Sequence, residues 1–241
     1  MIDLVIPAYK PGEDLARLLG EMKKQSKPLN KIIVMNTEEK YWTEFLEKYD
    51  DGFICDKVEV HHIKKEEFDH GNTRNQGISF SEAEYILLMT QDAIPADEFL
   101  VEKLFEGLQD EKTAVAYGRQ LSKNDCREAE KYTRSFNYPE NSRLKSQSDM
   151  EELGIKTFFC SNVCAMYKRK IYDLLGGFTK KTIFNEDMIF AGLAVKAGYF
   201  IAYVAEAKVI HSHNYGNMEQ LRRNFDLGVS QKEHPEVFEG I

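Results

Sequence analysis

The sequence predicts an α/β fold in which a mostly parallel sheet carries helices on both faces. Apolar runs of strand length begin near residues 4, 32, 58, 85 and 113, at steps of about 26 to 28 residues. Such steps are too long for hairpins and suit strand–helix–strand units. Because strands and helices alternate, we expect a mostly parallel sheet that is covered on both sides.

The intervals between these runs have the pattern of amphipathic helices. In the first interval the apolar residues recur at the i, i+3, i+4, i+7 spacing of one helix face. They are Leu15, Leu18, Leu19 and Met22. We expect this helix from about residue 13, and further helices over residues 41–48, from about Asn72 and over residues 96–108.

The second half of the chain is less regular. Residues from about 121 to 152 are polar, and we expect a long excursion with some helix that serves as a functional loop or lid. The remaining expected elements are a strand over 157–167, a helix over 186–197 ended by Gly198, a strand over 199–210, a basic amphipathic helix over 218–227 and a frayed tail. We divide this single domain, residues 1–241, into a first half (1–118), a second half (119–230) and a tail (231–241).

The composition fits a globular protein and disfavours several classes of function. Hydrophobic residues make up 42% of the chain and the net charge is −8, so nothing favours bulk binding to nucleic acid. The chain enters a strand-like run at once, without the pattern of a targeting segment, and charges interrupt its longest apolar stretch. The motifs of P-loop, dinucleotide-binding, zinc-protease and serine-hydrolase sites are missing. The four cysteines form no CxxC pair, so we expect buried free thiols in a reducing, cytoplasmic compartment.

Polar residues follow the predicted strands at the edge where such sheets bind ligands. These edge positions are Pro7-Ala8-Tyr9, Asn36-Thr37-Glu38 and Thr90-Gln91-Asp92. Asp92 follows the buried run YILLM, and two interpretations are open. It could form a turn before Pro95, or its carboxylate could bind Mg²⁺ or Mn²⁺.

A second segment, residues 69–78, reads DHGNTRNQGI. Gly71 permits close approach of another group, and Asn72 or Thr73 can cap a helix. Together with Arg74, the helix N-terminus could bind a phosphate or diphosphate. The alternative is an ordinary cap with a surface arginine.

Two later pairs of residues carry further chemistry. Glu186 and Asp187 open a predicted helix, where acids are common because of the macrodipole, and one of them could instead be a general base. His211 and His213 end a predicted strand and would point to the same side. They could be metal ligands or structural histidines, and the residues alone leave both choices open.

The order of these motifs is more specific than any one of them. Over about residues 1–230 the chain resembles the inverting family-2 glycosyltransferases, on the ordered segments DLVIPAYKP, HGNTRNQGI, LLMTQDAIP, YGRQL, FCSNVCAMYKRKIYDLLGGF, NEDMIFAGLAVKAGY and VIHSHNY. The TQDA, SNV and HSHNY elements are most similar to the rhamnosyltransferase branch. The resemblance implies a GT-A fold, a Rossmann-like α/β domain of three layers with a mostly parallel, mixed central sheet. Residues 1–118 would then bind the nucleotide sugar, and residues 119–230 would bind the acceptor and carry catalysis.

The resemblance also assigns roles to residues. The metal-binding DxD motif of the family falls on residues 90–92, where only the second acid, Asp92, is present. The catalytic base falls on Asp187, beside Glu186, and the histidine after the last core strand falls on His211, with His213 as its rival. The other implied positions are donor contacts at Pro7, Ala8, Tyr9, Gly71, Arg74, Asn75 and Gln91, and a sugar or acceptor pocket at Ser161 and Asn162. The chain departs from the family after the second strand, where an Asp-rich loop is replaced by NTEE, so Glu38 becomes the candidate nucleoside contact.

The activity implied by the resemblance is inverting transfer of a sugar to a glycan or lipid-linked acceptor, with dTDP-rhamnose as the expected donor and Mg²⁺ or Mn²⁺ as cofactor. Basic clusters at 168–170, 180–181 and 222–223 could contact the inner face of a membrane or be solvated surface charge. The alternatives are another donor (UDP-glucose, UDP-galactose or UDP-N-acetylhexosamine) and a nucleotide-sugar-binding relative that has lost catalysis. A sugar nucleotidyltransferase is disfavoured, because PAYKPGEDL is a poor match to its signature loop. The oligomeric state stays open.

Overall fold

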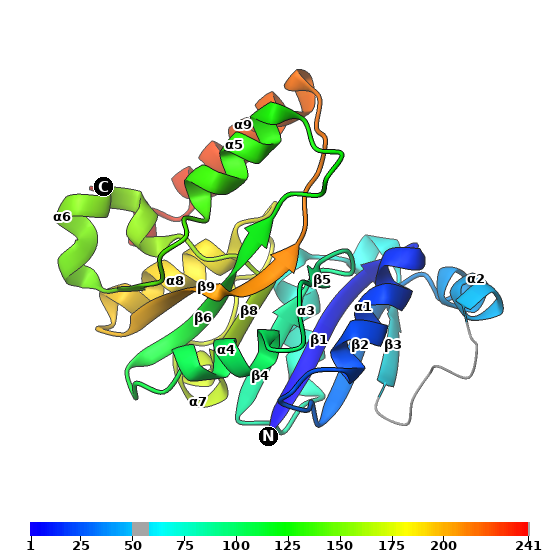
Figure 1. The fold of residues 1–241 in the computed structure, drawn as a ribbon. Helices are drawn as coiled ribbons and strands as arrows, with labels where there is room; N and C mark the ends of the chain where they lie inside the picture. The colour runs from blue at the N-terminus through cyan, green and yellow to red at the C-terminus, as the bar shows by residue number, and fades with distance from the viewer. Residues whose placement is uncertain (50–57, 241) are drawn as a thin grey trace.

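A computed structural model describes residues 1–49 and 58–240, and its strands form one mixed sheet (Figure 1). The strands are β1 (Ile2–Tyr9), β2 (Lys31–Thr37), β3 (Val58–Ile63), β4 (Tyr85–Met89), β5 (Ile94–Pro95), β6 (Thr113–Leu121), β7 (Arg143–Lys145), β8 (Cys164–Lys168) and β9 (Phe200–Ile210). Their order is β3-β2-β1-β4-β8-β6-β9-β5, with β7 paired to the edge of β9. The first four strands are parallel to one another, β8 is antiparallel to both of its neighbours, and β6 and β9 are again parallel. The predicted mostly parallel, mixed sheet is therefore confirmed.

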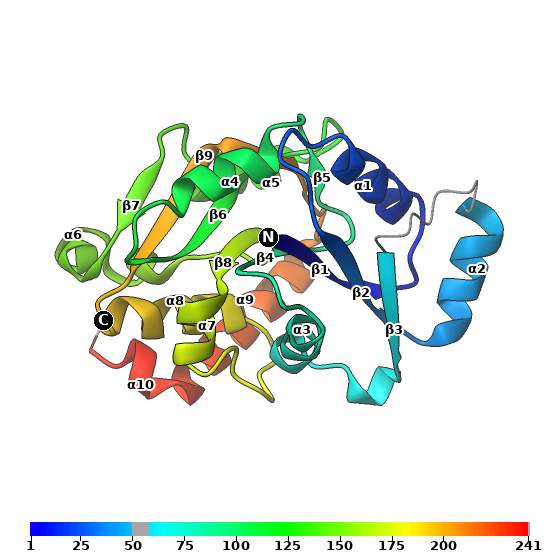
Figure 2. The same ribbon diagram turned by 90° about the horizontal axis from the view of Figure 1, so that it is seen from below.

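Helices cover both faces of the sheet, so the predicted three layers are confirmed (Figure 2). The helices are α1 (Glu13–Lys23), α2 (Glu39–Tyr49), α3 (His70–Ser79), α4 (Leu100–Gly107), α5 (Glu128–Asn137), α6 (Met150–Leu153), α7 (Arg169–Leu174), α8 (Glu186–Lys196), α9 (Asn217–Glu233) and α10 (Pro235–Phe238). Short 3₁₀ turns are η1 (Lys65–Glu67), η2 (Gln147–Asp149) and η3 (Gly154–Phe158). The apolar sides of α1, α2 and α4 pack in one core cluster, and those of α3, α7, α8 and α10 pack in the other. None of these helices has the length and apolar character needed to cross a bilayer.

Most expected elements are present, and two of their boundaries are wrong for identifiable reasons. The fourth helix begins at Leu100 instead of residue 96, because β5 and a turn occupy the residues before it. The strand expected over 157–167 is limited to its last part, β8. The residues before β8 cannot continue a ladder, because the N–H of Asn162 is bonded to the Asp187 carboxylate and the N–H of Val163 to the hydroxyl of Ser161.

The end of the chain is more ordered than we expected. The last long helix, α9, continues to Glu233, well beyond the predicted 218–227. Residues of the expected frayed tail form α10, whose Val237 is fully buried. It packs on α8 at Gly192, where an added Cβ would lie 2.3 Å from Val237. Cys126, Cys160 and Cys164 are buried free thiols as predicted, whereas Cys55 and Ile241 lie outside the described residues.

The carboxyl ends of the parallel strands β1, β2, β3, β4, β6 and β9 meet at one edge, and the two least regular segments of the chain lie beyond it. The segments that follow β6 and β9 extend past this edge before they lead into α5 and α9 (Figure 1). The turn after β4 belongs to the same edge. Side chains from three separate regions of the sequence can therefore meet there.

Candidate active site

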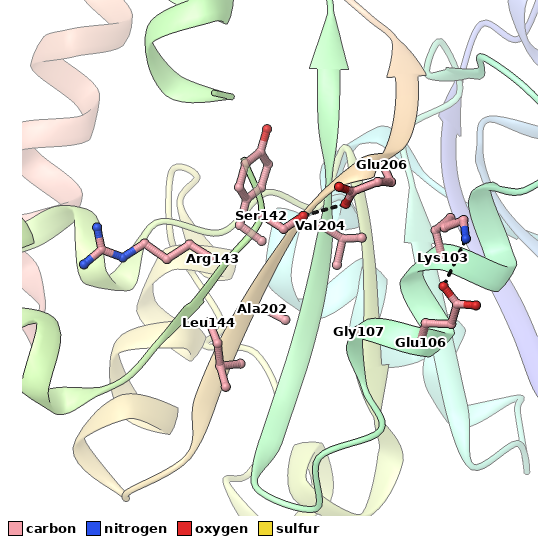
Figure 3. Close-up of a pocket in the computed structure, with 10 residues that line it drawn as sticks. Lys103, Glu106, Gly107, Ser142, Arg143, Leu144, Ala202, Val204 and Glu206 are labelled. Atoms are coloured by element: carbon pink, nitrogen blue, oxygen red, sulfur yellow. Dashed lines mark hydrogen bonds and ion pairs between the residues drawn. The ribbon is translucent and has the colours of Figure 1, made fainter. Parts of the chain in front are cut away.

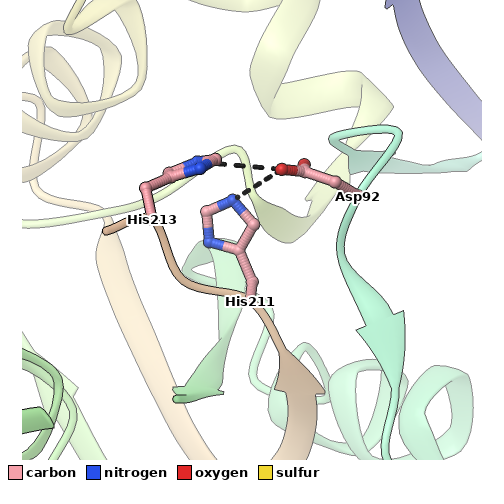
Figure 4. A group of neighbouring side chains, drawn as sticks. All are labelled: Asp92, His211 and His213. Atoms are coloured by element: carbon pink, nitrogen blue, oxygen red, sulfur yellow. Dashed lines mark ion pairs between the residues drawn. The ribbon is translucent and has the colours of Figure 1, made fainter. Parts of the chain in front are cut away.

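One cluster of side chains at this edge has the geometry of a metal site. Asp92 lies in the turn after β4, and His211 and His213 follow β9 directly. Their ligand atoms all lie within 4.8 Å of one another. Both Nε2 atoms face the same carboxylate oxygen, at 3.5 Å for His211 and 3.7 Å for His213 (Figure 4). We call these three residues the Asp–His–His cluster.

The carboxylate of the Asp–His–His cluster is held in its charged form. Burial alone would raise the pKa of Asp92, but the hydrogen bond and charge of His211, together with the charge of His213, lower that pKa below its usual range. Burial also lowers the pKa of His213, which favours the neutral imidazole that binds metals. The cluster thus combines one anionic oxygen with imidazole nitrogens.

The buried side chain of Gln120, near the end of β6, fixes the tautomer of His211. Arg134 can only donate, and its Nη1 donates to Gln120 Oε1, so this atom is the carbonyl oxygen. The amide nitrogen of Gln120 donates to the hydroxyls of Tyr138 and Ser161. His211 Nδ1 lies 3.1 Å from Gln120 Oε1 and must therefore carry a proton.

The consequence is that the neutral form of His211 directs its Nε2 lone pair toward Asp92. A lone pair that faces a carboxylate requires a shared proton or a cation between them. A second hydrogen bond that orients a ligating histidine in this way is typical of metal sites. The donor set therefore fits a divalent ion, and its two nitrogens favour Mn²⁺ over Mg²⁺, which prefers oxygen ligands.

A second cluster lies at the start of α8, where the two acids of the predicted pair, Glu186 and Asp187, have different environments. Asn185, the residue before the helix, has a left-handed backbone with φ of 79°, which asparagine tolerates better than most residues. Glu186 is 3% exposed. Its Oε1 forms an ion pair with Arg74 Nη1 at 3.1 Å and accepts a hydrogen bond from Asn162 Nδ2 at 2.9 Å. Burial alone would raise the pKa of Glu186, but the charges of Arg74 and His70 and the Asn162 hydrogen bond lower it.

Asp187 is partly exposed and has the opposite shift. Its two oxygens accept from the backbone N–H groups of Asn162 and Met188, each at 2.8 Å. Burial and the neighbouring charge of Glu186 raise the pKa of Asp187 to about 7, against the effect of those hydrogen bonds. A carboxylate with a pKa near the working pH is well matched to accept a proton. The geometry thus separates a fixed anion, Glu186, from a more accessible carboxylate, Asp187, whose pKa suits proton transfer.

The motif around α3 contacts the segment that leads to α8. The cap of α3 is Asp69, whose Oδ1 accepts from the N–H of Asn72 at 2.6 Å. An added Cβ on Gly71 would lie 1.9 Å from the carbonyl oxygen of Thr179, so the glycine permits that contact. Both ends of the Asn75 amide bond to the backbone of Phe178.

These contacts give the motif a structural role. Arg74 is 5% exposed, and its guanidinium faces Glu186 and the His70 carbonyl. Arg74 is therefore not a surface arginine, which was the alternative interpretation of this segment. The helix N-terminus that we expected to bind a diphosphate already holds an aspartate cap. The donor contacts expected at Gly71, Arg74 and Asn75 therefore stay predictions, while the structure places all three in internal contacts.

The positions expected to hold the nucleoside lie at the ends of β1 and β2. Gln91 joins β1 to the turn after β4, because its amide accepts from the N–H of Tyr9 at 3.1 Å and donates to its carbonyl at 3.0 Å. The side chain of Ala8 is buried and that of Pro7 is partly buried, whereas the Tyr9 ring is exposed and packs edge-on against Tyr41. Glu38 has φ of 69°, and its carboxylate accepts from the N–H of Lys65 at 2.7 Å.

A cavity of about 320 Å³ lies beside these residues and includes Gln91 and Asp92 together with Lys10 and the start of α1. A larger cavity of about 370 Å³ between α4 and β9 contains none of the predicted site residues (Figure 3). In that cavity Ser142 donates to Glu206 at 2.6 Å and accepts from the N–H of Ala205, which fixes the segment before β7 to β9. Of these two cavities, only the smaller one is lined by predicted site residues, Gln91 and Asp92.

The structure brings the predicted residues into two linked clusters. The Asp–His–His cluster connects through Gln120 to Ser161, and the next residue, Asn162, holds both acids at the start of α8. The sequence reasoning missed Gln120, Arg134 and Tyr138 as site residues. The only signal was that Gln120 belongs to the YGRQL segment at a strand end.

This arrangement, a curled mixed sheet with an aspartate at the β4 edge and an acid pair at the start of a helix, is the GT-A architecture of glycosyltransferases. The fold is similar to that of the mannosyltransferase PcManGT from Pyrobaculum calidifontis in complex with GDP-Man and Mn²⁺, with a TM-score of 0.71 at 12% identity. That likeness covers 98% of this chain and 64% of the other. It is also similar to S. aureus TarS 1–349 in complex with UDP-GlcNAc, with a TM-score of 0.66 at 14% identity, over 98% of this chain and 67% of the other.

The chain belongs to glycosyl transferase family 2, whose model matches residues 3–176. It is 38% identical to the O-antigen chain rhamnosyltransferase RfbN of Salmonella typhimurium (strain LT2) over 229 residues, which are 95% of this chain and 71% of that protein. It is 36% identical to the O-antigen chain rhamnosyltransferase WbaN of Salmonella anatum over 231 residues, which are 94% of this chain and 70% of that protein. The chain is therefore a glycosyltransferase, with relatives that are rhamnosyltransferases.

Proposed function

We propose that this chain transfers a sugar, with inversion, from a nucleoside diphosphate to a saccharide hydroxyl, and that its donor is dTDP-L-rhamnose. The observation that carries the mechanism is the position of Asp187, a partly exposed carboxylate with a pKa raised to about 7, in a network that connects to the Asp–His–His cluster. The rhamnosyltransferase relatives support the choice of sugar.

On the donor side, Asp92, His211 and His213 would hold Mn²⁺ or Mg²⁺. When bound, that ion would neutralise charge on the leaving diphosphate. Gln120 keeps His211 in the tautomer that presents Nε2 to the ion. Pro7, Ala8, Tyr9, Gln91 and Glu38 are the proposed contacts to the nucleotide, beside the cavity at the end of β1.

On the acceptor side, Asp187 removes the proton of the attacking hydroxyl. The acceptor oxygen bonds to the anomeric carbon, while the bond from that carbon to the diphosphate breaks and its electron pair leaves on the diphosphate oxygen. Attack from the face opposite the leaving group inverts the anomeric configuration. Ser161 and Asn162 shape the pocket between the two sides, and Glu186 stays buried as a fixed anion.

The acceptor follows from the relatives and from the surface. We propose an O-antigen-type saccharide carried on a lipid, glycosylated in the cytoplasm at the inner face of the membrane. The basic clusters near residues 168–170 and 180–181 are the proposed membrane contacts, where each cation contributes about 1 kcal/mol. The split into a donor half (1–118) and an acceptor half (119–230) is part of the same proposal.

A donor panel tests the proposal. Nucleotide sugars that include dTDP-rhamnose, UDP-glucose, UDP-galactose, UDP-N-acetylglucosamine and GDP-mannose would be compared by thermal stabilisation with Mn²⁺ or Mg²⁺. We expect dTDP-rhamnose to stabilise most, and Asp92→Ala to remove the part of that stabilisation that depends on metal. Asp187→Asn should bind the donor normally and transfer no sugar. Greatest stabilisation by another sugar would reassign the donor, and donor binding by the wild type without transfer to any saccharide acceptor would identify a non-catalytic relative.

A further inference from the structure

Arg223, in the second turn of α9, lies over two aromatic rings beside the candidate site. Its guanidinium carbon is 4.9 Å from the centre of the Tyr215 ring and 5.5 Å from that of Phe184. Planar guanidinium groups stack favourably on aromatic faces. The side chain nevertheless stays exposed, as do all residues from 217 to 225.

The two rings connect Arg223 to both clusters of the site. Tyr215 stacks on His213 of the Asp–His–His cluster, with ring centres 5.0 Å apart. Phe184 lies two residues before Glu186, at the approach to α8. Burial is the main cause of the lowered pKa of His213, and the charge of Arg223 contributes to it, which is consistent with this proximity. The guanidinium is therefore placed between the metal-type ligands and the start of the catalytic helix.

The charge of Arg223 has no partner in the described parts of the chain. Arg74, Arg134 and Arg143 each form an ion pair with a carboxylate, whereas Arg223 forms none within residues 1–49 and 58–240. An exposed cation beside a site that receives a diphosphate is available for that ligand, because arginine matches phosphate oxygens with a planar pair of donors. Arg74, the sequence candidate for this contact, is buried against Glu186.

We propose that Arg223 binds the diphosphate of the donor and stabilises it as the leaving group. Tyr215 and Phe184 position the guanidinium, and Tyr215 connects it to His213 of the Asp–His–His cluster. This role rests on the proposed function, since it requires a nucleoside diphosphate in the site. It gives α9 a direct part in catalysis, although the helix follows all the family motifs along the sequence.

The test compares Arg223→Ala and Arg223→Lys with Arg222→Ala, a matched control at the exposed neighbouring position. Binding of dTDP and of dTMP, with UDP and GDP in parallel, would be measured by titration calorimetry with Mn²⁺ at low and moderate salt. We expect Arg223→Ala to weaken dTDP binding about 10- to 100-fold and dTMP binding by less than about threefold. Arg223→Lys should recover part of the loss, Arg222→Ala should bind like the wild type, and transfer by Arg223→Ala should fall at least as far as dTDP affinity.

The outcomes separate this assignment from the proposed function. Equal dTDP affinity in the wild type and Arg223→Ala overturns the role of Arg223 alone. Equal losses of dTDP and dTMP binding also overturn it, because they indicate a contact that is not with the diphosphate. Failure of the wild type to bind any nucleoside diphosphate overturns the proposed function and this assignment with it. Because the side chain is exposed, the melting temperature of each variant should match that of the wild type.

Discussion

The pH dependence of transfer is the most direct test of the assigned base. Burial and the fixed charge of Glu186 raise the pKa of Asp187 to about 7. Only the ionised carboxylate can accept the proton of the acceptor hydroxyl. Because the pKa is raised, the inactive protonated form accumulates as the pH falls below about 7, whereas an ordinary aspartate, with a pKa near 3.9, would stay ionised.

The expected size of the effect follows from that value. With a pKa of about 7, roughly one tenth of Asp187 is ionised at pH 6 and roughly nine tenths at pH 8. The rate constant should therefore rise about tenfold between these two values, because the ionised fraction changes from about 1/11 to about 10/11. An unperturbed base would be almost fully ionised at both, and the rate would hardly change.

The measurement is kcat/KM for the acceptor from pH 5.5 to 8.5, at saturating donor and Mn²⁺ and constant ionic strength. Saturating metal matters because a protonated imidazole cannot bind a metal ion, so acid also weakens metal binding. That effect appears as a higher metal requirement, not as a lower rate at saturation. A pH-independent rate at saturating metal would refute the environment we assign to Asp187. If Asp187→Asn still transfers sugar and its kcat/KM falls at low pH as in the wild type, the titrating group is a different residue.

Three further substitutions test how the site is supported. Arg74→Met should lower the free energy of unfolding by about 3 to 5 kcal/mol in urea denaturation, because Glu186 is left as an unpaired buried charge. Gly71→Ala should cost at least about 1 to 3 kcal/mol by the same measurement, because its Cβ would meet the Thr179 carbonyl oxygen at 1.9 Å. Gln120→Met should weaken Mn²⁺ binding about 10- to 100-fold by calorimetry, because it removes the acceptor that orients a metal-site histidine.

Each substitution has a matched control, which either makes the same type of change at a position without the contact or also removes the partner residue. Arg74→Met combined with Glu186→Leu should recover part of the lost stability, since no unpaired charge remains. Gly228→Ala lies in α9 with nothing within 4 Å of the added carbon, and it should leave stability unchanged or slightly higher. Gln109→Met, at an exposed position, should not affect Mn²⁺ binding. Wild-type behaviour of Arg74→Met, Gly71→Ala or Gln120→Met would contradict the role assigned to that residue.

The main strands of the fold could be predicted because their signal is local. Strands buried on both faces of a sheet are continuous apolar runs, and four such runs are present as β1, β2, β4 and β6. The edge strand β3 is marked instead by the alternation Val58-Glu59-Val60. Short edge strands such as β5 and β7 have only two and three residues, which is too few for a pattern. The antiparallel direction of β8 depends on its neighbours β4 and β6, and a single segment carries no information about that pairing.

In the candidate site, too, features with a local sequence signal could be predicted, whereas features that depend on distant partners could not. The grouping of Asp92 with the two histidines could be predicted because they follow buried strands at a predictable edge of the sheet. The position of Asp187 could be predicted because acids are common in the first turn of a helix. The environment of Arg74 could not, because an arginine at a helix start usually faces solvent, and its partner comes from a distant part of the chain. The role of Gln120 depends on four partners from three separate segments, so no local pattern indicates it.

The pairing of Arg74 with Glu186 also explains how the base acquires its pKa. A carboxylate as buried as Glu186 would take up a proton unless a cation lay beside it, and a protonated Glu186 could no longer raise the pKa of Asp187. In the proposed mechanism the α3 motif therefore acts through the acid pair, because it keeps Glu186 charged and so keeps the pKa of Asp187, the proposed base, near neutral pH. The sequence suggested two separate motifs, the α3 segment for the donor and the acid pair of α8 for the acceptor. The ion pair between Arg74 and Glu186 joins them into one unit of the site.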